Sequence, residues 1–574
     1  MTDAIRRHRH FLMGLFIAAA AFLYLAHIGS YHLIELDEGR YHRVAMEMVL
    51  SGDYLTPHFD YMPYFEKPIF QYWITALSME LFGFKEFTGR ILPALTGLGN
   101  VFLAFWLGRT MYGRRTGILA AIIVATSALQ LIVASIGVMD MALTFFIDAC
   151  LVSFYVFERT ENKKYLLIFY AAMGFGMLTK GLIAIVFPVG ILFWYALLSK
   201  RPRLFLKLFY LPGIALFLVI AMPWYYLVCQ KNPDFFYFFF IREHFLRFAT
   251  KMHERFHPWY YFVPVLIAGL MPWTGFLATF FSKDGIFRKP GSLRHKQDLL
   301  LLSLWAGLIY VFYSISDSKL PTYILPCWLP LSVLLAASLE RCRQKGRWLG
   351  HSFLINAILC LLFTAAGIVY LMHTDFLTVA DFLTHGGLLI ASLLIGTLAA
   401  AWVWHRKRDF FSVLVILSVT AYGFGLGAHQ VQGQIHDHQT AYTVSQDIRA
   451  LHVPDSTPII MYGSFMPGLV YYLDRPIAAG NFMGELEFGI HHTDRTGMYY
   501  GSQDLYDRWN SDEPAVIVVQ PKYRDEALRV LGSAPNVSKF RKTNKRPSRI
   551  CGGLFVYDLS GFFIPLGLSL RRCR

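Results

Sequence analysis

The sequence predicts a polytopic α-helical membrane protein that ends in a small α/β domain. Three observations carry this prediction: 55% of the 574 residues are hydrophobic, only 16% are charged, and the mean hydropathy is +0.43. Soluble domains are typically about 25% charged. The 50 Phe, 32 Tyr and 12 Trp residues suit a chain whose outer surface faces lipid.

Apolar segments that are long enough to cross a bilayer occur about thirteen times, since a spanning helix needs roughly 20 mostly apolar residues. The first of them has basic residues before it and no small-residue cleavage site after it, so we predict a retained span and not a signal peptide. The predicted spans are residues 11–29, 90–110, 116–135, 138–157, 165–179, 181–199, 207–228, 259–281, 298–316, 321–339, 350–372, 383–404 and 409–428.

Basic residues alternate between the two sides of the predicted spans. Connections on one side, such as 159–164, 283–296 and 405–408, carry three to five Lys or Arg residues, and those on the other side carry none or one. Lys and Arg collect in cytoplasmic loops, so the N-terminus is predicted in the cytoplasm and the C-terminus on the far side. Much of the net charge of +15 is therefore topogenic, and we expect no nucleic-acid partner.

Three segments lie outside the predicted spans, and all are expected on the non-cytoplasmic face. They are residues 30–89, 229–258 and 429–574. In the last segment, strands predicted at 458–463 and 515–520 alternate with helices predicted at 465–473 and 503–510. This alternation predicts a membrane domain at 1–428 and a soluble α/β domain at 429–574.

The first outer segment combines charge with apolar periodicity. Residues 38–52 carry apolar side chains on one face and charges on the other, the pattern of an amphipathic helix on a membrane surface. Asp37 and Arg40 begin this stretch, and a second pair, Glu66 and Lys67, lies among aromatic residues and a proline. Either pair alone fits a simple interfacial salt bridge or a solvated turn.

Further ionisable residues are predicted on the same face. They are Asp140, Lys180, Arg242, Glu243, His244, Arg247 and Lys319, with Tyr323 close to the last. A single lysine here could simply extend to the interface. Together, however, these charges favour a site for a phosphorylated lipid, because Arg and Lys recognise phosphate. Carboxylates can orient a sugar, act as a base or hold a divalent cation.

Several motifs in series then resemble a known family. They are LDEGRY (36–41), YFEKPIFQYW (64–73), VMDMALTF (138–145), MLTKG (177–181), NPDFFYFFFIREHFLRF (232–248), HPWYYFVPVLIAGLMPW (257–273) and SKLPTYILP (318–326). In this order they resemble bacterial 4-amino-4-deoxy-L-arabinose (lipid A) transferases. These belong to the GT-C class of lipid-dependent glycosyltransferases and are related to protein O-mannosyltransferases.

The resemblance implies thirteen transmembrane helices, interfacial helices in the first periplasmic loop and a periplasmic α/β domain. It also implies a multi-pass enzyme of the bacterial inner membrane that moves aminoarabinose from undecaprenyl phosphate to lipid A phosphates. The less negative lipid A would confer resistance to polymyxin and cationic peptides. The expected partners are the lipid-linked donor, lipid A and membrane lipids, and the expected state is a monomer.

Residue roles follow from the matched motifs only. By this resemblance Asp37 and Asp140 are the catalytic carboxylates. The donor phosphate is expected at Arg40, Lys67, Lys319, Tyr323 and Tyr64, with further basic contacts from Lys180, Arg242 and Arg247. Glu66 and a residue of IREH, either His244 or Arg242, correspond to positions that bind a divalent metal, zinc or magnesium.

Two other functions remain open from the residues. A protein O-mannosyltransferase would use polyprenyl-phosphate mannose and would need Asp37 as a base for a hydroxyl acceptor. A lipid flippase would need midplane charges and paired broken helices, which the sequence does not predict. None of the seven cysteines forms a CxxC pair, and Cys551 and Cys573 could form a disulfide in an oxidising compartment.

Overall fold

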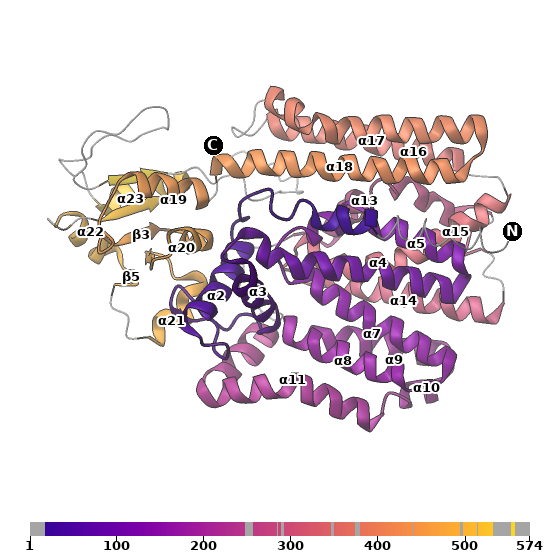
Figure 1. The fold of residues 1–574 in the computed structure, drawn as a ribbon, viewed down its shortest axis with the longest axis horizontal. Coiled ribbons are helices and arrows are strands. Elements are labelled where there is room, and N and C mark those ends of the chain that lie inside the picture. Colours follow the sequence, from indigo (N-terminus) through magenta and orange to yellow (C-terminus); the bar gives the residue numbers. More distant parts are fainter. Residues whose placement is uncertain are drawn as a thin grey trace.

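The computed structural model describes most of the chain. The described residues are 18–246, 257–283, 285–288, 292–345, 349–372, 379–439, 441–493, 497–511, 513, 515–531 and 553–556. A bundle of long helices forms one part of the molecule and a β-sheet with short helices forms the other. Figure 1 shows α2 and α3, from the first outer segment, between these two parts. Cys551 and Cys573, and with them the predicted disulfide, lie outside the described residues.

The bundle contains the apolar helices of the sequence. Its elements are α4 (Ile91–Tyr112), α5 (Arg114–Ala125), α6 (Ala128–Ala134), α7 (Asp140–Thr160), α8 (Lys164–Lys180), α9 (Ile183–Leu198), α10 (Pro202–Leu206), α11 (Leu211–Lys231), η2 (Tyr237–Leu246), η3 (Trp259–Tyr261), α13 (Phe262–Gly269), η4 (Thr274–Phe281), α14 (Leu293–Ile315), η5 (Pro321–Cys327), α15 (Trp328–Lys345), α16 (Leu349–Met372), α17 (Val379–Lys407) and α18 (Phe410–Gln439).

Among the described residues, seven helices are long and apolar enough to cross a membrane, or up to nine with two bent pairs. Predicted spans 165–179 and 181–199 coincide with α8 and α9, which have 17 and 16 residues, and predicted span 350–372 coincides with α16, whose residues 350–363 form a shorter apolar helix. Residues 11–17 of the predicted span 11–29 lie outside the described residues. The protein is thus a polytopic helical membrane protein, and the count of thirteen stays a prediction.

The two bent pairs correct the prediction that no span is broken. Residues 116–135 form α5 and α6 at 59° to each other, and residues 259–281 form η3–α13 and η4 at 107°. Thr126 and Ser127 return hydrogen bonds to the carbonyls of the preceding turn, which competes with helix continuation. Pro272 has no N–H to continue the second helix. The breaks meet, since the Ala128 N–H donates to Met271 at 3.0 Å.

Close backbone contact and buried aromatic residues hold the bundle together. A Cβ on Gly108 of α4 would come within 3.0 Å of the Cα of Gly117 in α5, so these helices pack through small residues. Trp273, Trp305 and Trp328 are each at most 1% exposed in the largest apolar cluster. Van der Waals packing of this kind associates helices in lipid, where the hydrophobic effect between them is weak.

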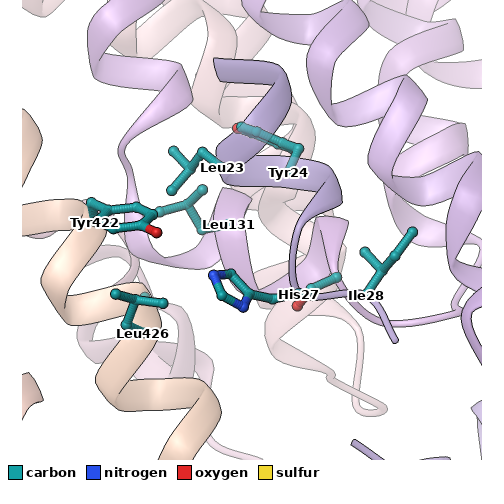
Figure 2. A pocket seen from close by; sticks show the side chains of 9 residues that line it. Leu23, Tyr24, His27, Ile28, Leu131, Tyr422 and Leu426 are labelled. Atoms are coloured by element: carbon teal, nitrogen blue, oxygen red, sulfur yellow. The ribbon is translucent and has the colours of Figure 1, made fainter. Parts of the chain in front are cut away.

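A small pocket lies between the first described helix (residues 18–25), α6 and α18 (Figure 2). Its wall combines apolar side chains with Tyr24, His27, Ser135 and Tyr422. Figure 2 shows Tyr24 and His27 on one side and Tyr422 and Leu426 on the other. None of the residues that the sequence singled out lines this pocket.

The first outer segment folds into α2 (Asp37–Ser51), the hairpin β1 (His58–Phe59) and β2 (Met62–Pro63), α3 (Phe70–Phe82) and η1 (Glu86–Arg90). The helix predicted at 38–52 is confirmed as α2. Its charged face, however, is not turned to water. The Arg43 side chain is fully buried, with Glu47 at 2.6 Å and Asp474 of the C-terminal region at 2.7 Å. The C-terminal region covers the face that an isolated interfacial helix would expose.

The C-terminal sheet has five parallel strands in the order β5-β4-β3-β6-β7. The predicted strands and helices of this region coincide with β3, β6, α20 and α22. Its elements are α19 (Ala441–Ala450), β3 (Ile459–Tyr462), α20 (Pro467–Leu473), β4 (Ala478–Gly480), η6 (Gly484–Leu486), α21 (Glu487–His491), β5 (Tyr499–Tyr500), α22 (Ser502–Trp509), β6 (Val516–Val519), η7 (Pro521–Tyr523), α23 (Arg524–Leu531) and β7 (Gly553–Val556).

Two glycines bring α2 and α20 into backbone contact. A Cβ on Gly39 would lie 2.6 Å from the nitrogen of Gly468, a distance that real Cβ atoms do not show. Leu469 and Val470 of α20 join Val44 and Met48 of α2 in one apolar cluster. Helix α20 of the C-terminal region is therefore packed directly on the helix that begins with Asp37.

Candidate active site

The site is built around a buried ion pair between Glu38 and Arg90. The Arg90 side chain donates to the two Glu38 oxygens at 2.6 and 2.9 Å. The same carboxylate accepts the backbone N–H groups of Ile34 and Gly137, each at 2.7 Å. Burial alone would raise the pKa of the Glu38 carboxyl, but the charge and hydrogen bonds of Arg90 hold that pKa below its usual value.

Arg90 also fixes the chain that leads into α2. Its guanidinium donates to the carbonyls of Ile28, Tyr31 and His32 at 2.7, 2.9 and 3.0 Å. The Tyr31 ring lies 3.9 Å from the guanidinium carbon, a cation–π contact. The Glu38–Arg90 pair thus ties the first described helix, α2, the start of α4 and the loop before α7 to one point.

Arg40 is the centre of the first group of predicted residues. Its Nη1 donates to Asp37 and to the Tyr64 hydroxyl, each at 3.2 Å, and its Nη2 pairs with Glu485. Arg40 is 2% exposed, whereas the Asp37 side chain retains 32% exposure. The cation is therefore buried while the carboxylate beside it stays accessible.

Glu66 and Lys67 complete this first group. The Lys67 ammonium is 3.8 Å from the Glu66 carboxylate and donates to the Glu66 carbonyl at 3.1 Å. Asp37, Glu66 and Lys67 all act electrostatically on Glu485. Three carboxylates consequently face two cations in a small volume.

Glu485 is a site residue that the sequence reasoning missed. It lies in η6, just after β4, in the region whose sequence matched no motif. Ligand sites of parallel sheets lie beyond the carboxyl ends of the strands, so the acidic residues that follow β4 were the available signal. Burial is the main cause that raises the pKa of Glu485 to about 7; Arg40 opposes this shift, and Glu66 and Asp37 add to it.

Asp140, Lys180 and Tyr323 form a second group. Asp140 begins α7, and its carboxylate accepts a hydrogen bond from Lys180 at the end of α8, at 2.7 Å. The Lys180 ammonium lies 5.0 Å from the centre of the Tyr323 ring.

Tyr41 lies within electrostatic reach of both groups. Burial first, and then the charge of Asp37, raise the pKa of its hydroxyl well above the usual value, and Asp140 adds to this effect. The two carboxylates that the sequence singled out therefore both lie within electrostatic reach of Tyr41.

The remaining predicted residues are placed differently. Lys319 is 2% exposed and donates to the carbonyls of His257, at 2.9 Å, and Ser316. Arg242 pairs with Glu487 of α21 at 2.5 Å. Within the described part of the chain, neither forms a hydrogen bond or ion pair with the two groups described above; Arg242 is joined to α21, which directly follows η6 with Glu485. Arg247 and the side chain of His244 lie outside the described residues.

The described residues do not provide a complete metal-ligand set. No group of three His, Cys, Asp or Glu side chains within them is arranged to hold a metal ion. The neighbour of Glu66 is the Lys67 ammonium, which competes with a cation for the same carboxylate. The chemistry considered below therefore uses only the side chains of the protein.

The arrangement suits one kind of chemistry. Buried cations stabilise a phosphate, and adjacent carboxylates stabilise positive charge that develops on a neighbouring carbon. Both effects are stronger where water is excluded, because the local dielectric is low. These side chains therefore suit a reaction in which an anionic phosphate leaves a carbon atom that becomes positively charged.

Known proteins resemble this chain in sequence and in fold. The family described as dolichyl-phosphate-mannose-protein mannosyltransferase matches residues 66–227. Undecaprenyl phosphate-α-4-amino-4-deoxy-L-arabinose arabinosyl transferase 2 of Pseudomonas fluorescens is 31% identical over 84% of this chain and 87% of its own length. The corresponding transferase of Edwardsiella ictaluri is 32% identical over 63% of this chain and 65% of its own length.

A solved structure agrees with these relatives. ArnT from Cupriavidus metallidurans bound to undecaprenyl phosphate superposes with a TM-score of 0.77 at 26% identity, over 91% of this chain and 95% of that chain. Its apo form gives the same TM-score.

The fold and the site define a polytopic membrane glycosyltransferase of the GT-C class. Within that class, the chain belongs to the family of undecaprenyl phosphate-α-4-amino-4-deoxy-L-arabinose arabinosyl transferases. The resemblance seen in the sequence motifs is thereby confirmed.

We predict that Glu38→Gln lowers the folding stability of the whole protein. It leaves the buried Arg90 guanidinium without its counter-charge, and breaking a buried pair costs about 3–5 kcal/mol. Thermal unfolding in detergent should show a lower midpoint and a lower folded yield. Glu161→Gln, in an exposed pair with Lys207, is the matched control and should leave both unchanged. A Glu38→Gln protein as stable as wild type would contradict the scaffold role of this pair.

Proposed function

We propose that the chain transfers 4-amino-4-deoxy-L-arabinose from undecaprenyl phosphate to a phosphate of lipid A. The observation that carries the proposal is the buried Arg40, held between Asp37, Tyr64 and Glu485 with Lys67 nearby. Its family relatives are named for the same donor. The product would carry less negative charge and would bind polymyxin and cationic peptides less tightly.

The reaction needs no strong general base. A phosphate monoester of lipid A is largely ionised near neutral pH, because its second pKa is near 6. One of its oxygens attacks the anomeric carbon of the sugar and forms the new carbon–oxygen bond. The bond from that carbon to the donor phosphate breaks, and its electron pair leaves with undecaprenyl phosphate.

Electrostatic stabilisation then supplies most of the catalysis. Arg40 and Lys67 would hold the departing phosphate, with Tyr64 as a hydrogen-bond donor. Lys319, Tyr323 and the basic residues Lys180, Arg242 and Arg247 would extend this binding surface. Asp37 and Asp140, which both act electrostatically on Tyr41, would stabilise positive charge on the sugar.

The charge balance of the first group favours an amino sugar over a neutral one. Asp37 and Glu66 lie beside Arg40 and Lys67, in addition to Glu485. After the two cations engage a donor phosphate, the charge of Asp37 and Glu66 remains for a protonated amine. A neutral hexose would offer these two carboxylates no counter-charge.

The experiment that tests the function is transfer from purified donor lipid to lipid A, read by mass spectrometry. We predict that Arg40→Ala and Lys67→Ala each lower the rate about a hundredfold or more. The transfer rate of Arg40→Lys should lie between those of wild type and Arg40→Ala, since lysine keeps the positive charge but lacks the planar guanidinium. Lys85→Ala, an exposed cation of the same outer segment, is the control and should be unchanged. Full activity of both alanine variants would refute the account, and hexose on a secreted protein would favour the mannosyltransferase instead.

A pH dependence follows from Glu485. Its raised pKa of about 7 means that it is charged above that pH and neutral below it. The neutral form releases Arg40 and no longer repels the donor phosphodiester, which stays anionic throughout. We predict that the KM for donor falls several-fold from pH 8 to pH 6, because protonation of Glu485 removes one negative charge that repels the donor phosphodiester. Glu485→Gln should have the low KM at both pH values, whereas a wild-type profile in that variant would contradict the assignment.

We further propose thirteen spans, with the N-terminus in the cytoplasm and with the active site and the domain at 429–574 in the periplasm. Alternation of basic loops supports this topology. An alkaline phosphatase fusion at the C-terminus should be active, and a fusion after residue 164 should not. We also propose a monomer, which light scattering in detergent should report as one 65.8 kDa chain.

A divalent ion, zinc or magnesium, is a separate proposal. Glu66 would supply one ligand, and His244 of the second outer segment would supply another. Elemental analysis of the purified protein should find about one bound ion per chain, and Glu66→Gln with His244→Ala should remove it. Equal metal content in wild type and the double variant would reject the site.

A further inference from the structure

We infer that Glu35 is a positioning residue, through which the C-terminal region holds Asp37 in its active orientation. The inference rests on the proposed function, because it assigns a cause to the placement of a residue used there. Glu35 itself is not expected to contact the substrate.

The backbone just before Asp37 is strained. Leu36 precedes α2 and has φ 71° and ψ −82°. These angles belong to the γ-turn with positive φ, which is rare and strained for a residue with a side chain. Such conformations cost of order 1–3 kcal/mol and persist only where the surroundings over-determine them. Something outside the turn must therefore impose it.

Glu35 connects this turn to the C-terminal region. Its side chain is buried, with the residue 8% exposed, and its Oε2 accepts the Gly468 N–H of α20 at 3.2 Å. Leu33, two residues earlier, donates its N–H to the Tyr472 hydroxyl of the same helix at 2.8 Å. α20 thus holds the chain at two points on the N-terminal side of Leu36.

The opposite side of the turn is held independently. The Ile34 N–H donates to Glu38, and Glu38 pairs with Arg90. Directly after the turn, Gly39 lies against the backbone of Gly468. Glu35 and Glu38 therefore bracket Leu36 and Asp37, one anchored on the C-terminal region and the other in the membrane part.

Gly468 is matched to this role. A Cβ at that position would lie 2.1 Å from the Glu35 carboxylate, so a side chain there would displace it. The second Glu35 oxygen has no hydrogen-bond partner among the described residues. The Oε2 atom also accepts the Leu36 N–H at 3.5 Å, so the shorter hydrogen bond, from Gly468, is the one that links this carboxylate to the C-terminal region.

A role in positioning Asp37 predicts a change in kcat with little change in the KM for donor, and a control variant reports a general loss of stability. In the transfer assay, Glu35→Ala should lower kcat about tenfold or more, the range that release of such a turn implies. The KM for donor should stay within twofold of wild type, because Arg40 and Lys67 are untouched. Glu158→Gln, a buried acid at the far end of α7, is the control for a general loss of stability and should keep the kcat of wild type.

A second variant makes the test specific to the turn. Glycine adopts positive φ without strain. Leu36→Gly in the Glu35→Ala background should therefore recover kcat several-fold, whereas Leu36→Ala in that background should not. If kcat is unchanged in Glu35→Ala, or if glycine and alanine behave alike, the inference is wrong. If wild type itself moves no aminopentose, the proposed function fails instead.

Discussion

The Glu38–Arg90 pair is the interaction on which the rest of the site depends. A buried ion pair stabilises a protein only when its remaining hydrogen-bonding groups are also satisfied. Here the carboxylate accepts backbone N–H groups from both sides, and the guanidinium donates to three carbonyls of the chain before α2. The pair therefore sets backbone positions on several elements at once, which a surface salt bridge cannot do.

Both candidate carboxylates are placed by this pair. Asp37 is the residue next to Glu38, and Gly137, bonded to Glu38, lies three residues before Asp140. Glu38 is thus hydrogen-bonded to both of the segments that carry the candidate carboxylates. This arrangement suits electrostatic catalysis, in which preorganised charges act only if they need not move during the reaction.

The C-terminal region is part of the site and not an appendage to it. It covers the charged face of α2 through the Arg43–Asp474 pair, and it supplies Glu485 to Arg40. It also contacts the strained turn at Leu36 through Glu35. Covering a charged helix at a membrane surface excludes water from the cations, and the lower dielectric strengthens their interaction with a phosphate. The sheet thereby provides at an interface the enclosure that a soluble enzyme obtains from its own core.

The class of the protein and its approximate helices could be predicted from the sequence, which also proposed most of the charged residues of the candidate site. Apolar length, loop charge and motif order are local properties, so they can be read without a structure. α2, β3 and β6 form where local periodicity predicted them.

The pairing of these charges could be seen only in the folded structure. Glu485 joins Arg40 across more than four hundred residues, and Lys319 binds carbonyls although its motif resembled that of a phosphate ligand. The broken spans also depend on long-range contact, since the Trp273 side chain donates to Thr126 and the Ala128 N–H donates to Met271 only in the folded chain. Long-range pairing depends on packing geometry, and residue spacing along the chain does not encode that geometry in any local pattern. Glu38, to which the sequence motifs assigned no catalytic, phosphate-binding or metal-binding role, is for this reason the centre of the buried hydrogen-bond network with Arg90.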